Sequence, residues 1–293
     1  MFGNFIHFII VLLIYATYQP SNASNFPPVE TACLFAGFFT LFGCYAKYGF
    51  KRLERRLTRE AAAQITHLAS KLEARQTIVA IGFYAINIYG LNLTIYLSKI
   101  SIFRTIPTLQ AVFCVVVFLG YLIVIWSASH RFRHHSGQTN LTLKNHVISN
   151  LSFALPVLLP WIALSGMADL IQALPFKFAK QILSTAEGQL VYFLVFLGAI
   201  SIVGPAMIQK FWRCKPLEIG PERDGIERVC RKAGVAYNNI LRWPIFGGQM
   251  ITAGVMGLVK RFRYILVTDA LLRYLSFDEL DAVMAHEIGH VKQ

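Results

Sequence analysis

Long apolar stretches separated by short polar segments occupy the first two thirds of the chain. Six of them are long enough, or nearly so, to cross the roughly 30 Å hydrocarbon core of a bilayer. They run over residues 2–18, 30–50, 77–97, 108–126, 150–171 and 189–209. The pattern predicts a membrane α-helical N-terminal region of about six spans, with residues 1–212 forming a multi-span membrane domain.

Composition supports a membrane protein. The 293 residues are 55% hydrophobic and only 15% charged, a balance unlike that of a soluble enzyme of this size. The formal net charge of +13 needs no nucleic acid as a partner. Basic cytoplasmic loops and anionic lipid headgroups suffice to explain it, so the lipid bilayer is the expected partner.

The basic residues predict the orientation of the spans. Three of the loops share one side and carry Lys47, Lys51, Arg52, Arg55, Arg56, Arg59, Lys71, Arg75, Arg131, Arg133, Lys144, Lys210, Arg213 and Lys215. The opposite loops carry only Lys99, Arg104, Lys177 and Lys180. Because basic loops stay inside, we expect a multi-pass protein of the bacterial inner membrane whose C-terminal segment is cytoplasmic.

Two N-terminal segments need a separate interpretation. Ser21-Asn22-Ala23 resembles a signal-peptidase site, but no basic segment precedes the apolar run, so a retained first span is favoured over a cleaved signal peptide. Residues 51–76 place leucine, isoleucine and alanine at helical spacing and predict a cytoplasmic amphipathic helix. Such a helix lies on the membrane surface or packs on the soluble domain, and we favour the membrane surface.

Polar residues and prolines inside the predicted spans indicate packing features. Asn87 and Asn92 are expected to bond a neighbouring helix, and Pro156 and Pro160 to kink the fifth span. Such features could line a substrate cavity, but ordinary packing is the favoured interpretation. The five cysteines form no C-x-x-C pair, which favours reduced, structural thiols.

Residues 213–293 have the pattern of a separate cytoplasmic domain. Pro221 and Gly234 bound one predicted helix, and residues 250–258 and 264–268 are predicted strands. A short helix through Leu271 and Leu272 follows. A sheet edge beside a metal site can hold an extended peptide by main-chain hydrogen bonds, and Tyr264 to Thr268 is the candidate for it.

The sequence His286-Glu287-Ile288-Gly289-His290 carries the candidate chemistry. On a helix, His286 and His290 lie one turn apart on one face and can bind a single zinc ion. Glu287 projects from nearly the same side, where it can take a proton from a zinc-bound water and pass it to a leaving amine. The H-E-x-x-H pattern thus predicts metal-assisted peptide hydrolysis, with protein or peptide substrates.

The surrounding residues favour a buried helix. Ser276 and Glu279 form an S-x-x-E capping box, and apolar residues follow at helical spacing up to Val291. Glu287 interrupts the apolar stripe, where burying a carboxylate without a partner is costly. Ala282, Ala285 and Gly289 would let a second element approach, so we expect the helix to be mostly buried. A solvated helix with an incidental motif is the alternative, but it does not explain the position of Glu287.

Three neighbouring segments together resemble a known family. They are Tyr264 to Leu272, Leu275 to Val283 and Ala285 to Val291. They are similar to the core of the membrane-anchored zinc endopeptidases that include the HtpX quality-control protease and the CAAX prenyl-protease. The resemblance covers about residues 215–293 and implies the beginning of an α+β zincin-like catalytic domain. It also implies that His286 and His290 are zinc ligands and that Glu287 is the catalytic base.

The resemblance implies a third zinc ligand, a glutamate on a later helix, which is expected beyond residue 293. Asp278, Glu279 and Asp281 are the upstream alternatives. Glu279 lies about 10 Å from His286 along the helix axis and is better explained as a cap. We therefore expect one zinc ion, with the chain being the N-terminal part of a longer protease or a truncated product.

Three hypotheses follow. The first is a membrane-anchored zinc metalloendopeptidase that cleaves membrane or misfolded proteins on the cytoplasmic side. The second is an inactive fragment or pseudoenzyme that serves as a membrane binding module. The third is a transport or scaffold protein with an incidental motif. Bound zinc and a loss of proteolysis on replacing Glu287 would distinguish the first from the others.

Overall fold

The computed structural model describes residues 3–19, 26–55, 62–136, 141–175, 177–245 and 250–292. The chain folds into two compact units. One contains residues 1–147 and 161–180, and the other contains residues 148–160 and 181–293. The possible signal-peptidase site at residues 21–23 lies outside the described residues.

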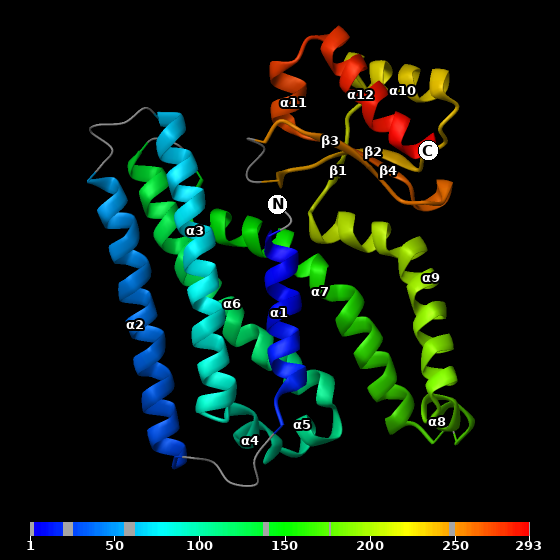
Figure 1. Cartoon of the computed structure of the whole chain (residues 1–293). Coiled ribbons are helices and arrows are strands. Elements are labelled where there is room, and N and C mark those ends of the chain that lie inside the picture. Colours follow the sequence, from blue (N-terminus) through cyan, green and yellow to red (C-terminus); the bar gives the residue numbers. More distant parts are fainter. Residues whose placement is uncertain are drawn as a thin grey trace. The chain divides into compact units, whose positions relative to one another are not determined.

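The first unit is a helical bundle (Figure 1). Its long helices are α1 (Gly3–Thr17), α2 (Pro28–Glu54), α3 (Ala62–Ala85) and α6 (Pro107–His135). Helix α6 packs against the other three and contributes more of the described buried side chains than any other helix of the unit. Phe118 of α6 is fully buried and meets Phe8 of α1 edge to face, with the ring centroids 5.8 Å apart. Aromatic packing around α6 thus forms the core of the unit.

Four of the described helices are long and apolar enough to cross a membrane. They are α2, α6, α7 (Leu143–Ala173) and α9 (Ala186–Phe211). Helix α1 is a shorter apolar helix, so the six predicted spans are not confirmed. Helix α7 continues through Pro156 and Pro160 as one element.

The predicted span over residues 77–97 is divided in the structure. Helix α3 carries Lys71, Glu73 and Arg75 near its middle and passes into the π-helix η1 (Ile86–Gly90). Asn92 then takes the left-handed conformation with φ 49°, and α4 (Leu93–Ser98) and α5 (Ser101–Thr105) follow as short helices. A residue in the left-handed conformation cannot continue a right-handed helix. The hydropathy pattern therefore overestimates the length of this span.

Both asparagines near this break hydrogen-bond other parts of the bundle. Nδ2 of Asn87 donates to the hydroxyl of Tyr121 on α6 at 2.8 Å. The hydroxyl of Tyr18 donates to Oδ1 of Asn92 at 2.7 Å. The packing interpretation of these two residues is confirmed.

The sequence analysis did not assign a role to Asp169. Its Oδ2 accepts a hydrogen bond from the backbone N–H of Thr108 at 2.7 Å and so caps α6.

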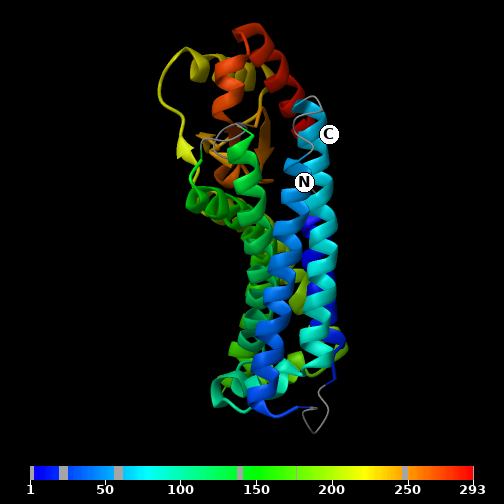
Figure 2. The ribbon, with the colours of Figure 1, turned by 90° about the vertical axis from the view of Figure 1, so that its left-hand side faces the viewer.

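The amphipathic pattern at residues 51–76 is shared between two helices. Residues 51–54 end α2, and residues 62–76 form the first part of α3. Figures 1 and 2 both show α2 and α3 side by side, running in opposite directions. The apolar positions of this segment, among them Leu53 and Leu68, pack with Phe50 and with Phe132 of α6. The periodicity therefore serves packing between helices.

The second unit contains α9 and the C-terminal elements, together with the middle of α7 and part of α8 (Lys177–Leu183). The C-terminal elements are β1 (Lys215–Pro216), α10 (Pro221–Ala233), β2 (Asn239–Arg242), β3 (Ala253–Met256), η3 (Lys260–Phe262), β4 (Tyr264–Val267), α11 (Asp269–Tyr274) and α12 (Phe277–Lys292). The helix bounded by Pro221 and Gly234 is confirmed, with Gly234 left-handed at φ 66°. The predictions did not include β1 and β2.

The four strands form one mixed sheet in the order β1-β2-β4-β3. Strand β2 pairs with β4 in parallel, and β1 and β3 are antiparallel to their neighbours. Residues Tyr264–Val267 are therefore an inner strand, buried at every position. The prediction of a free edge at Tyr264 to Thr268 is wrong, because β3 pairs with β4 and takes the edge position.

Each face of the sheet is covered. On one face α10, α11 and α12 enclose a core that includes Ile226, Ile265 and Met284. On the other, Leu241 and Leu266 pack with Trp212, at the end of α9. The indole rings of Trp212 and Trp243 stack with centroids 4.6 Å apart. This stacking attaches the sheet to the end of the preceding apolar helix.

Candidate metal centre

Burial of one side of α12 determines where the two candidate histidines point. Met284 and Ile288 are 0% and 1% exposed and pack in the core under the sheet. His286 and His290 each follow one of them by two residues, which rotates their side chains by about 200° around the helix. Both histidines are therefore exposed. The packing of α12 turns its metal-binding face outward.

The imidazole rings of His286 and His290 converge on one point. Their Nε2 atoms lie 3.3 Å apart, and the rings are nearly perpendicular, with centroids 4.8 Å apart. Two nitrogens that each lie about 2.0–2.1 Å from a tetrahedral zinc ion would be about 3.3 Å apart. The positions of these two side chains therefore fit two ligands of one zinc ion.

Glu287 lies between the buried and exposed sides of the helix. Its side chain is partly exposed, whereas its neighbour Ile288 is buried. No ion pair links its carboxylate to any residue in the described ranges. The carboxylate is thus available to a water molecule beside the histidine pair.

The expectation of a mostly buried helix is wrong. Ala282, Ala285 and Gly289 lie on the exposed face of α12 together with the two histidines. A Cβ added at Gly289 would meet no described atom within 4 Å. The described elements cover only the face that carries Met284 and Ile288, so the histidine face is open to a substrate or a further segment.

The N-terminus of α12 has the predicted capping box. The backbone N–H and the hydroxyl of Ser276 both donate to Oε2 of Glu279 at 2.8 Å. These bonds from the backbone and the side chain of Ser276 lower the pKa of the Glu279 carboxyl. Glu279 is therefore occupied as a cap, which agrees with its exclusion as a zinc ligand.

An ion pair links α12 to α10. Nη1 of Arg228 lies 3.6 Å from Oδ2 of Asp281. The hydrophobic side chains of Ile226 and Cys230 on α10 pack in the same core as Leu280. Asp281 is thus engaged away from the histidines. Sequence reasoning did not single out Arg228, because the spacing between two distant helices leaves no local pattern.

Thr268 connects the sheet to the helices that follow it. It is fully buried, and its hydroxyl accepts from the N–H of Thr252 at 3.1 Å and donates to the Thr252 carbonyl at 3.0 Å. The same hydroxyl caps α11 by accepting from the N–H of Leu271. Thr268 therefore fixes the end of β4, from which α11 and then α12 begin.

Within the described ranges, no group of three or more histidine, cysteine, aspartate or glutamate side chains could hold a metal ion. The histidine pair supplies two nitrogen donors, whereas zinc sites of hydrolytic enzymes use three protein ligands and one open position. The third ligand inferred from the resemblance is not among the described residues.

Comparison with known proteins gives one family match. Residues 223–293 match the family model described as Peptidase family M48. The chain is also similar to the crystal structure of S. mikatae Ste24p, at 19% identity and a TM-score of 0.36, over 92% of this chain and 68% of that one. No curated protein matches the chain. The matched family segment contains α12 and the whole of the histidine motif.

Proposed function

Because residues 223–293 match peptidase family M48, we propose that this chain is part of a membrane-anchored zinc metalloendopeptidase. Its substrates are membrane or misfolded proteins, which it cleaves on the cytoplasmic side. The observation that carries the proposal is the 3.3 Å separation of the His286 and His290 Nε2 atoms on an exposed helix face. Apolar helices long enough to cross a bilayer support the membrane anchor.

His286 and His290 would hold the zinc ion, each through Nε2. When bound, zinc supplies Lewis-acid chemistry that polarises a carbonyl and makes hydroxide accessible near neutral pH. Each imidazole would donate the lone pair of its Nε2 atom to the metal. The third ligand would come from a segment that approaches the open face of α12.

Glu287 would act as the general base and then as the general acid. Its carboxylate takes a proton from the attacking water and delivers it to the leaving amine. Because the side chain is partly exposed and forms no ion pair with a described residue, no described cation holds the carboxylate away from the attacking water. Glu287 is not a ligand in this scheme, so its loss should stop turnover and leave the metal bound.

Strand β3 is the element that could align a substrate. Among the described strands it pairs only with β4, and it packs beside α12. An extended peptide can bind a free strand edge through main-chain hydrogen bonds, whatever its side chains are. This would allow cleavage of unfolded segments with little sequence preference.

A second candidate function is a membrane binding module without catalysis. It is favoured by one observation, the presence of only two donors in the histidine group among the described residues. In that case the chain would keep its membrane helices and its sheet but would not hydrolyse peptides.

Zinc analysis and proteolysis of an unfolded protein by the full chain distinguish the two candidates. For a protease, the wild type binds about one zinc per chain, and Glu287→Gln keeps the zinc and loses at least about 100-fold in turnover, the lower range of a general acid–base contribution. Glu218→Gln, at an exposed position outside the motif, is the matched control and should retain activity. Wild-type protein without zinc, or unchanged turnover in Glu287→Gln, would leave only the binding module.

A further inference from the structure

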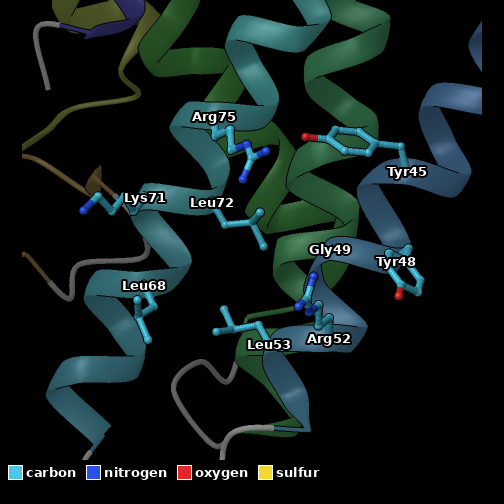
Figure 3. Close-up of a pocket in the computed structure, with 9 residues that line it drawn as sticks. All are labelled: Tyr45, Tyr48, Gly49, Arg52, Leu53, Leu68, Lys71, Leu72 and Arg75. Atoms are coloured by element: carbon cyan, nitrogen blue, oxygen red, sulfur yellow. The ribbon is translucent and has the colours of Figure 1, made fainter.

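A second feature of the chain lies in the first unit, in the groove between α2 and α3 (Figure 3). The groove has a volume of about 630 Å³ and is lined by residues of both helices. Leucines form its floor, and basic side chains stand along its margins. It belongs neither to the histidine motif nor to the family match, which begins at residue 223.

The floor is apolar and well supported. Leu53 is 7% exposed, and Leu68 and Leu72 pack against the same cluster of buried side chains. Gly49 allows the helices to approach here, because a Cβ at this position would lie 2.7 Å from Nε2 of Gln76. Nε2 of Gln76 donates to the carbonyl of Ala46 at 3.1 Å and so joins the two helices at this crossing. The groove is therefore a built feature with a fixed inner surface.

The margin carries three cations, Arg52, Lys71 and Arg75, all exposed. In Figure 3, Arg52 of α2 and Arg75 of α3 extend toward the space between the helices from opposite sides. None of the three forms an ion pair with a residue in the described part of the chain. Within the described part of the chain, no ion pair therefore balances the positive charge of the groove.

The two described carboxylates at this end of α2 and α3 are paired with other residues. Glu73 pairs with Nη2 of Arg133 at 2.9 Å, and Glu54 lies 3.1 Å from Nδ1 of His135. Both partners are on α6, which contributes no residue to the lining of the groove. Among the described residues, no carboxylate forms an ion pair with a cation of the groove, so the complementary anion is sought outside them.

Both helices place the groove at one level of the membrane. In α2, residues 28–46 carry no basic side chain and span about 28 Å at about 1.5 Å per residue, close to the thickness of the hydrocarbon core. In α3, the last charged residue is Arg75, and residues 76–85 are uncharged. The cations of the groove therefore lie where hydrocarbon meets headgroups. Tyr45 and Tyr48, which also line it, are typical of this boundary.

We propose that this groove binds one anionic phospholipid. Its phosphate pairs with Arg52 and Arg75, and an acyl chain covers Leu53, Leu68 and Leu72. Guanidinium groups match phosphate oxygens in a bidentate geometry. An anionic headgroup is favoured over a zwitterionic one because it brings no further cation beside these arginines. A free phosphate would leave the leucines uncovered, whereas a lipid satisfies both the floor and the margin.

Native mass spectrometry of the detergent-purified full chain can test the site by titration with phosphatidylglycerol and with phosphatidylcholine. We expect tighter first binding of phosphatidylglycerol. Arg52→Gln/Arg75→Gln should weaken it by at least about fivefold, the effect of about one cation at a lipid surface. Leu68→Trp, which fills the groove and changes no charge, should weaken it too.

Lys47→Gln/Lys51→Gln is the matched control, since it removes two exposed cations of α2 that do not line the groove. It should bind phosphatidylglycerol as the wild type does. Equal losses in the two double variants would mean general charge attraction and would overturn the proposal, as would equal wild-type affinity for both lipids. Displacement of the lipid by glycerol 3-phosphate at comparable concentration would identify a free-phosphate site and also overturn it.

Discussion

His286 and His290 turn their Nε2 atoms toward each other at 3.3 Å because Met284 and Ile288, on the opposite side of α12, are buried. The hydrophobic core thus determines which way the helix face with the two candidate ligands is turned. This arrangement and the contacts around it can be tested in four ways.

Replacing one histidine should remove the metal and leave the fold intact. We expect His290→Ala to lose essentially all bound zinc, since a single remaining histidine gives one donor in place of two. His290 is exposed, so the free energy of unfolding of the metal-free protein should change by at most about 0.5 kcal/mol. Zinc content and chemical unfolding measure the two effects. His67→Ala, at an exposed position on α3, should keep the zinc; retention of zinc in His290→Ala would place the metal elsewhere.

Truncating a buried side chain under the metal centre should destabilise the fold. Met284 is 0% exposed, and Met284→Ala should lower the free energy of unfolding of the second unit by about 2–5 kcal/mol through lost burial and a cavity. Ala285→Ser, at an exposed position of the same helix, should change it by less than about 0.5 kcal/mol. Urea unfolding of both variants tests the packing of α12. A loss of unfolding free energy in Met284→Ala as small as that in Ala285→Ser would show that Met284 is not in the core.

The capping box should make stability depend on acid. The pKa of Glu279 is lowered by its bonds from Ser276, so the folded state favours the ionised carboxylate. The stabilisation of the folded state by the ionised Glu279 carboxylate is complete above the ordinary pKa of glutamate. It is lost as the pH falls through the lowered pKa of the folded state. Melting temperatures of wild type and Glu279→Gln should therefore differ at neutral pH and converge in strong acid. Asp278→Asn, in the same helical turn but outside the box, should not remove this pH dependence; a constant gap between wild type and Glu279→Gln would contradict the cap.

Cys214 and Cys230, which follow α9 in the chain, should react slowly with maleimide. Burial raises the pKa of Cys214 to about 12 and that of Cys230 to about 11. A raised pKa lowers the thiolate fraction at pH 8, and the thiolate is the nucleophile. We expect maleimide labelling of both residues, followed by mass spectrometry, to be at least about tenfold slower in the folded than in the urea-unfolded protein. Equal rates in the two states would show that neither thiol is protected.

Local patterns predicted the C-terminal helices well. Pro221 and Gly234 bound α10, and Ser276 and Glu279 begin α12, because caps depend on residues within one turn of each other. The short strands were harder. Strands β1 and β2 were missed, and Tyr264–Val267 was placed at an edge although it is an inner strand, since strand order depends on partners distant in sequence. The membrane helices show the same limit, because hydropathy does not reveal the break at Asn92.

The sequence by itself determined the chemistry of the candidate site. The spacing of His286 and His290 places both on one helix face, because the helical repeat is a local property of the backbone. The tertiary structure alone decided that this face is open, that β3 lies at an edge of the sheet, and that Arg52 and Arg75 line one groove. These depend on which distant surfaces bury each other, and burial is a property of the packed chain that no short window contains.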